Sequence, residues 1–295
     1  MKKILNYGSL NIDKTFTLDH IVKPGETISS NTFSKNAGGK GCNQAGALAK
    51  AGCEVYMAGK IGPDGNFLID LLNQFNVNTD YISTEGTITG QALIQVSKSG
   101  QNSIILNPGA NFENSKSEID SVINNFSKGD YLILQNEINN IEYIINKGYE
   151  KGLIICFNPS PFNDEILNLP LEKVSYFFVN EIEAAQITQV NENDNFIETL
   201  NTISSKFPNS KIIMTVGKEG AYYSFNQVTL HQDIIDAPVI DTTAAGDTFM
   251  GYFIASLIYN YEVKDALFYA TKASAVTVSK EGALISIPLK EDIFE

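Results

Sequence analysis

The second half of the chain contains four short apolar runs: YLIL at 131–134, IICF at 154–157, YFFV at 176–179 and IIMTV at 212–216. The stretches between these runs read as helices. Strands that are apolar throughout are buried on both faces, which is typical of a parallel sheet covered by helices. The pattern therefore predicts an α/β fold of three layers, with helices on both faces of a mostly parallel central sheet.

The first third of the chain has a different pattern. Residues 11–33 alternate around a turn at Pro24-Gly25, and residues 87–106 alternate around Ser97–Gly100. Two-residue alternation around turn residues predicts β-hairpins, which fit poorly in a parallel sheet. We therefore expect a small separate β-sheet, placed as a lid over the site. The expected body comprises residues 1–10, 34–84 and 112–295, and the expected lid comprises residues 11–33 and 85–111.

The charge of the chain narrows the possible functions. Its 295 residues include 34 acidic side chains and 21 basic ones, which gives a net charge of −13, and every basic residue is a lysine. An acidic chain without arginine is a poor ligand for nucleic acid or for an anionic membrane. Two histidines leave little room for a histidine-rich metal site or a Ser-His-Asp triad. If the protein handles phosphate, it must do so without an arginine clamp.

Cysteine usage and hydropathy indicate the compartment. Cys42, Cys53 and Cys156 are odd in number and contain no C-x-x-C pair, which predicts reduced thiols. The apolar runs are far shorter than the roughly 20 residues that a membrane span needs. We expect a cytoplasmic protein with no membrane segment.

The strongest chemical signal is DTTAAGDTF at 241–249, which leads into an apolar helix. Ala244, Ala245 and Gly246 then lie at a helix N-terminus, where free N–H groups and the helix dipole favour an anion. Asp247 would stand beside this anion hole. An anion hole next to a carboxylate suits phosphoryl transfer to a hydroxyl group. Alternatively, Asp247 is one of the many aspartates found near helix N-termini.

Two further motifs predict a small-ligand site. NAGGKGCN at 36–43 places three glycines around Lys40, as in a loop that encloses a ligand, although it matches neither a Walker A loop nor G-x-G-x-x-G. GSLNID at 8–13 puts Asn11 and Asp13 on one side of an extended segment, which suits sugar hydroxyls. A tight turn and an Asx turn remain the alternatives for these two motifs.

Polar residues also follow three of the predicted parallel strands. They are QNE at 135–137, NEIE at 180–183 and TVGKEG at 215–220. Because ligands bind at the carboxyl ends of parallel strands, the three segments predict one rim of an active-site crevice. Each segment alone could equally be ordinary strand-to-helix capping.

Together these motifs resemble the ribokinase-like (PfkB) family of carbohydrate kinases, and more closely its ribokinase branch. The resemblance runs nearly end to end, because the following segments occur in the family's order: GSLNID, NAGGKGCNQA, LNPGAN at 106–111, FNPSP at 157–161, NEIEAA, TVGKEGAYY and DTTAAGDTF. The fold that it implies is a three-layer α/β domain with a four-stranded β lid, often shared between two subunits of a dimer.

The resemblance also implies residue roles. Asp247 would be the catalytic base, and Ala244, Ala245 and Gly246 would form the anion hole. The sugar would be held by Asn11, Asp13, Gly39, Lys40, Asn43 and Glu137. Asn180 and Glu183 would organise phosphate and Mg²⁺. The nucleotide site would be lined by Thr215, Gly217 and Gly220, with Thr271 near adenine. A monovalent cation such as K⁺ would be held by Asp241, Thr243, Thr277, Lys280, Gly282 and Ser286.

The expected function is therefore an ATP-dependent, Mg²⁺-requiring sugar kinase that acts on a primary hydroxyl, with D-ribose as the favoured acceptor. Asn136 and Asn107-Pro108 depart from the family pattern near the sugar, so fructose, a nucleoside or 2-keto-3-deoxygluconate stay open as acceptors. A catalytically silent sugar-binding protein on the same fold is a further alternative. Ala92, Ile94 and Val96 share one apolar lid face that needs covering, which favours a homodimer through the lid.

Overall fold

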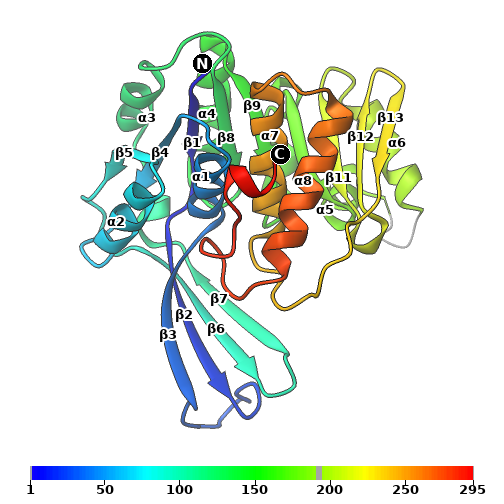
Figure 1. Cartoon of the computed structure of the whole chain (residues 1–295). Helices are drawn as coiled ribbons and strands as arrows, with labels where there is room; N and C mark the ends of the chain where they lie inside the picture. The colour runs from blue at the N-terminus through cyan, green and yellow to red at the C-terminus, as the bar shows by residue number, and fades with distance from the viewer. Residues whose placement is uncertain (1, 191–194, 295) are drawn as a thin grey trace.

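The computed structural model describes residues 2–190 and 195–294, and in these residues nine strands form one central sheet (Figure 1). Its strand order is β13-β12-β11-β10-β9-β8-β1-β4-β5. All neighbouring strands from β5 to β11 are parallel, and β12 alone runs in the opposite direction, because it pairs antiparallel with both β11 and β13. This confirms the predicted mostly parallel sheet. The strands are β1 (Ile4–Tyr7), β4 (Val55–Lys60), β5 (Asn78–Ser83), β8 (Tyr131–Gln135), β9 (Ile154–Asn158), β10 (Tyr176–Asn180), β11 (Lys211–Thr215), β12 (Ala221–Phe225) and β13 (Val228–Gln232).

Helices cover both faces of this sheet, and each face has its own apolar core. In β11, for example, Ile213 belongs to one core while Ile212 and Met214 belong to the other. One core contains α1 (Lys40–Lys50), α2 (Asn66–Gln74), α7 (Ala245–Ile258) and α8 (Val263–Val278). The other contains α3 (Lys116–Ile123), α4 (Ile141–Lys151), α5 (Glu181–Thr188) and α6 (Phe196–Lys206). The three-layer prediction is confirmed.

A second sheet of four strands, which we call the lid, projects from the body below β1 in the view of Figure 1. Its order is β3-β2-β6-β7, and β2 and β6 at its centre are parallel. The strands are β2 (Asn11–Leu18), β3 (Thr32–Gly38), β6 (Gly90–Ser97) and β7 (Asn102–Asn107). Both predicted hairpins are present, since β2 pairs antiparallel with β3 and β6 with β7.

The predicted boundary between lid and body at residues 33 and 34 is wrong. β3 continues to Gly38, which pairs with Asn11, so residues 34–38 belong to the lid rather than to the body. The first five residues of β3 are exposed because this strand is an edge of the lid. An exposed edge strand carries polar side chains on both faces, so its sequence lacks the alternation that marks a half-buried strand.

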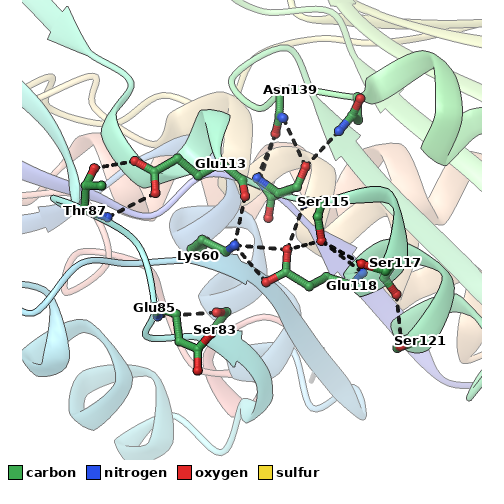
Figure 2. Close-up of polar contacts among 12 residues, drawn as sticks. Lys60, Ser83, Glu85, Thr87, Glu113, Ser115, Ser117, Glu118, Ser121 and Asn139 are labelled. Atoms are coloured by element: carbon green, nitrogen blue, oxygen red, sulfur yellow. Dashed lines mark hydrogen bonds and ion pairs between the residues drawn. The ribbon is translucent and has the colours of Figure 1, made fainter.

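One ion pair and several hydrogen bonds anchor the returning end of the lid on the body, as Figure 2 shows. The ammonium group of Lys60, at the end of β4, donates to the carbonyl oxygen of Glu113 at 2.8 Å and lies 2.7 Å from Glu118 Oε1. The carboxylate of Glu113 in turn accepts hydrogen bonds from the backbone and the hydroxyl of Thr87. Both segments that lead to β6 and away from β7 are therefore tied to β4 and to the start of α3. In the described residues, no helix is long and apolar enough to cross a membrane.

Candidate active site

A cavity of about 1500 Å³ lies where the lid meets the carboxyl ends of the parallel strands. The lid contributes Asp13, Thr15 and Ile94 to its wall. The body contributes residues at or just beyond the carboxyl ends of β8, β9, β10 and β11, together with the start of α7. The strand ends that the sequence predicted as a shared rim therefore do line one crevice, at the place where open α/β sheets bind ligands.

The start of α7 forms an open helix N-terminus in this cavity. Ala244 precedes the helix with φ 60°, and no side chain caps the end. The N–H of Ala245 donates to the carbonyl of Thr242 at 3.2 Å. A Cβ atom on Gly246 would meet no atom of the described residues within 4 Å, so the space beside this turn is open to a ligand. A helix start of this kind can bind an anionic group.

Asp247 stands in the first turn of α7 and is only 7% exposed. Its Oδ2 accepts a hydrogen bond from Asn43 Nδ2 at 3.2 Å, and its Oδ1 accepts one from Gln44 Nε2 at 2.8 Å. Both donors belong to α1, which packs closely on α7 because Gly251 of α7 faces Ala47 without a side chain between them. The carboxylate is therefore held in one orientation beside the anion-accepting helix end.

The predicted sugar-binding residues also gather on this cavity: its lining includes Asn11, Asp13, Gly39, Lys40, Asn43 and Glu137. Asp13 belongs to β2 of the lid, and Glu137 follows β8 of the body. Glu137 accepts hydrogen bonds from the backbone N–H of Lys40 at 3.0 Å and from the hydroxyl of Ser9. The lid and the body thus both contribute polar groups to one ligand site.

Charge is concentrated at this end of the cavity. Burial, and secondarily the nearby charge of Glu137, raises the pKa of Asp13 to about 7. Burial also raises the pKa of Glu137, against the opposing effect of Lys40. For Lys40, burial works to lower the pKa, but the carboxylates of Asp247, Glu137 and Glu183 together raise it above its usual value. Lys40 is thus a charged ammonium surrounded by acidic groups.

Of the residues predicted to bind nucleotide, some line the cavity and others do not. Asn180 and Glu183 line the cavity and form a capping box at the start of α5, in which Asn180 Oδ1 accepts from Glu183 N at 2.7 Å and Glu183 Oε2 accepts from Asn180 N at 3.0 Å. Thr215 lines the cavity as well. Gly217, Gly220 and Thr271 are absent from the lining formed by the described residues. Gly220, with φ 82°, packs on the carbonyl of Gln232, and Thr271 is buried in α8.

Of the residues predicted to bind a monovalent cation, three are joined by hydrogen bonds around Asp241 and three are not. Asp241 accepts hydrogen bonds from the backbone and hydroxyl of Thr243 and from the N–H of Gly282. Burial works to raise the pKa of Asp241, but these hydrogen bonds outweigh it and hold the pKa below its usual value. The other three lie elsewhere: the Thr277 hydroxyl donates to Thr248 Oγ1, the Ser286 hydroxyl donates to the carbonyl of Ala283, and Lys280 is exposed. Among the described residues, no three His, Cys, Asp or Glu side chains cluster as a metal site.

The hydrogen bonds that link Gln44 and Gln135 to Asp247 were not predicted. Gln135 was expected only as part of the polar rim after β8, and it does not line the cavity. Gln44 donates to Asp247, and Gln135 at the end of β8 donates to Gln44. The sequence offered one signal for both residues, namely an amide side chain within an apolar helix or strand. A buried amide of this kind must find hydrogen-bond partners. Sequence spacing does not reveal those partners, since Gln44 and Asp247 lie 203 residues apart in the chain.

A three-layer body, a β lid and a carboxylate at an anion-accepting helix end define a phosphotransferase for small alcohols. The chain belongs to the pfkB family of carbohydrate kinases, which matches residues 1–290 and confirms the resemblance drawn from the motifs. It is 31% identical to the ribokinase of Haemophilus influenzae over 306 residues, which cover 100% of this chain and 98% of that protein. It is 34% identical to the bifunctional ribokinase/ribose-5-phosphate isomerase A of Fructilactobacillus sanfranciscensis, covering 99% of this chain but 56% of that longer protein.

Solved structures agree with these relatives. The ribokinase of Cryptococcus neoformans var. grubii serotype A in complex with ADP superposes with a TM-score of 0.87 at 32% identity, covering 100% of this chain and 99% of the other. The Arabidopsis thaliana ribokinase complexed with ribose and ATP gives a TM-score of 0.86 at 26% identity, covering 99% and 97%. The fold is therefore ribokinase-like, and the chain is a ribokinase-like sugar kinase.

Proposed function

We propose that this protein transfers the γ-phosphoryl group of ATP to the primary hydroxyl of D-ribose, giving D-ribose 5-phosphate. The observation that carries the proposal is the position of Asp247, which is oriented by two amide donors beside the open helix end of α7. The same cavity is lined by Asn11 and Asp13 of the lid. Ribokinase relatives near 30% identity, and the ribose and ATP bound by the Arabidopsis thaliana enzyme, support this choice of acceptor and donor.

In the proposed reaction, Asp247 accepts the proton of the sugar hydroxyl. The hydroxyl oxygen forms a bond to the γ-phosphorus, and the bond from this phosphorus to the β–γ bridging oxygen breaks, so that ADP leaves. The N–H groups of Gly246 and its neighbours at the start of α7 would stabilise the charge on the transferring phosphoryl group. Positioning and preorganised dipoles supply most of such a rate enhancement.

Two cations would fit oxygen-rich parts of the cavity. Asn180 and Glu183 present oxygen atoms, which Mg²⁺ prefers, next to the predicted phosphate position. Asp241 and Thr243 present oxygen atoms for a monovalent cation such as K⁺ near the start of α7. When bound, these cations would offset the negative charge of the phosphates, a role for which the chain offers no arginine.

A coupled assay of ADP release over a panel of acceptors tests the function. The panel includes D-ribose, 2-deoxy-D-ribose, fructose, a nucleoside and 2-keto-3-deoxygluconate. We expect D-ribose to give the highest kcat/KM. A higher value for another acceptor would change the substrate but keep the chemistry. Saturable sugar binding without turnover of any acceptor would instead favour a silent sugar-binding protein.

A homodimer formed through the lid is part of the same proposal. Ile104 and Leu106 of β7 are about half exposed, at 52% and 50%, and they lie beside Ile94 and Ala92 of β6 on one lid face. A second lid would cover this apolar surface. Light scattering at micromolar concentration should give the mass of two chains, and a monomer would count against the proposal. We also propose a cytoplasmic location, because all three cysteines are buried free thiols.

A further inference from the structure

We propose that Asn6, Gln135 and Gln44 form a relay of buried amides that fixes a hydrogen-bond donor on Asp247 and thereby holds this carboxylate in one orientation. We call these three residues the amide relay. The inference rests on the proposed role of Asp247 as the base. It assigns a positioning function to side chains that do not touch the substrate.

The relay runs from a backbone carbonyl to the carboxylate without a gap. Asn6 Nδ2 donates to the carbonyl of Gly41 at 2.7 Å. Gln135 Nε2 donates both to Asn6 Oδ1 at 3.0 Å and to Gln44 Oε1 at 2.7 Å. Gln44 Nε2 then donates to Asp247 Oδ1 at 2.8 Å. All three relay residues are at most 1% exposed, and none belongs to the lining of the cavity.

The chemistry of the two ends sets the direction of every amide in the relay. The carbonyl of Gly41 can only accept, so Asn6 must turn its amino group towards it and its oxygen towards Gln135. Gln135 must then present its amino group, whose two hydrogens serve Asn6 and Gln44. Gln44 consequently turns its oxygen towards Gln135 and its amino group towards Asp247. Reversing Gln44 alone would place amide oxygen against carboxylate oxygen and amino group against amino group.

The side-chain oxygen of Gln135 has no partner, which indicates that this residue is needed for the hydrogen bonds it donates and not only for packing. Gln135 Oε1 is buried and has no hydrogen-bond partner among the described residues. It points at Gly8, where an added Cβ atom would lie only 2.1 Å from it. A buried acceptor without a partner is unfavourable, and an apolar side chain of similar length would avoid it. The glutamine is therefore explained by its two donated hydrogens.

The relay acts on the orientation of Asp247 through the donor that it holds. Gln44 binds Oδ1 and Asn43 binds Oδ2, so the two donors together fix the plane of the carboxylate. Without Gln135, Gln44 can rotate and the donor on Oδ1 is no longer fixed. The orientation of Asp247 towards the sugar hydroxyl then becomes less defined.

The test uses Gln135→Met and Gln44→Met, which keep side-chain length and apolar packing but remove the amides. We expect kcat to fall by roughly 10- to 100-fold, the loss that a small misplacement of a reacting group can cause. The sugar KM should stay within about twofold, because none of the relay residues belongs to the lining of the cavity. Because both residues act through one chain, the double variant should be no slower than Gln44→Met alone.

The control is Ser256→Ala, which removes a buried hydrogen bond of α7 that does not involve the relay. It should leave both kcat and the sugar KM close to their wild-type values. Wild-type kcat in folded Gln135→Met or Gln44→Met, or losses that multiply in the double variant, would overturn the relay. These outcomes leave the proposed function intact, whereas near-wild-type turnover of Asp247→Asn would remove the base itself.

Discussion

Asp13 and Asp247 line the same cavity from opposite sides, yet their surroundings differ. Asp247, in the body, accepts hydrogen bonds from Asn43 and Gln44. Asp13, in the lid, accepts none from the described part of the chain, and its burial, with the nearby charge of Glu137 as the second cause, raises its pKa to about 7. The proposed base is thus oriented before a sugar binds, while the lid carboxylate has acceptor positions that the hydroxyl groups of the proposed sugar could fill.

The largest expected effect is the loss of kcat when Asp247 is replaced. Asp247→Asn keeps the shape of the side chain but removes the proton acceptor, so kcat should fall by about 10³-fold or more. The protein should stay folded and still bind ATP, because the change removes no apolar contact. Steady-state kinetics, thermal unfolding and nucleotide titration together check this expectation.

Asp13→Asn should have a smaller effect of a different kind. It replaces charge-assisted hydrogen bonds to the sugar, each worth about 1.5–3 kcal/mol, by neutral ones. We expect the sugar KM to rise by about 10- to 100-fold, with a smaller change in kcat. The matched control is Asp19→Asn, an exposed lid aspartate paired with Lys98, which should leave the sugar KM unchanged. If Asp13→Asn lowered kcat alone, the division of roles between the two aspartates would be wrong.

The sequence predicted most of the fold and many of the cavity residues, for physical reasons. Strands such as Tyr131–Gln135 are buried throughout, so their apolar composition identified them directly. The exposed edge strand Thr32–Gly38 lacked that signal, and its residues 34–38 were placed in the body. The contacts of Asp247 with Gln44 and of Gln44 with Gln135 depend on the packing of α1 between α7 and the central sheet, which no local pattern encodes.

The pH dependence of sugar binding would sharpen the comparison further. Asp13 accepts hydroxyl donors best when ionised, and its pKa in the free enzyme is about 7. The kcat/KM for the sugar should therefore rise with pH up to about 7, by close to tenfold per pH unit at most, and then level off. In Asp13→Asn this rise of kcat/KM with pH should disappear. The test compares the kcat/KM profiles of the variant and the wild type between pH 5 and 9. Identical profiles would mean that another group controls binding.

The smallest effect concerns the stability of the free protein. Because the pKa of Asp13 is raised from 3.8 to about 7 on folding, the native state binds more protons than the unfolded state between about pH 4 and 7. The free energy of unfolding therefore falls as pH rises through this window, and the full loss is present above pH 7. For a side chain that is partly exposed in the open cavity we expect on the order of 1 kcal/mol. Urea unfolding should show Asp13→Asn to be more stable than the wild type at pH 8 but equal to it near pH 4. A constant difference across this range would show that the lid carboxylate is not strained by its surroundings, and the contrast with Asp247 would then rest on hydrogen bonds alone.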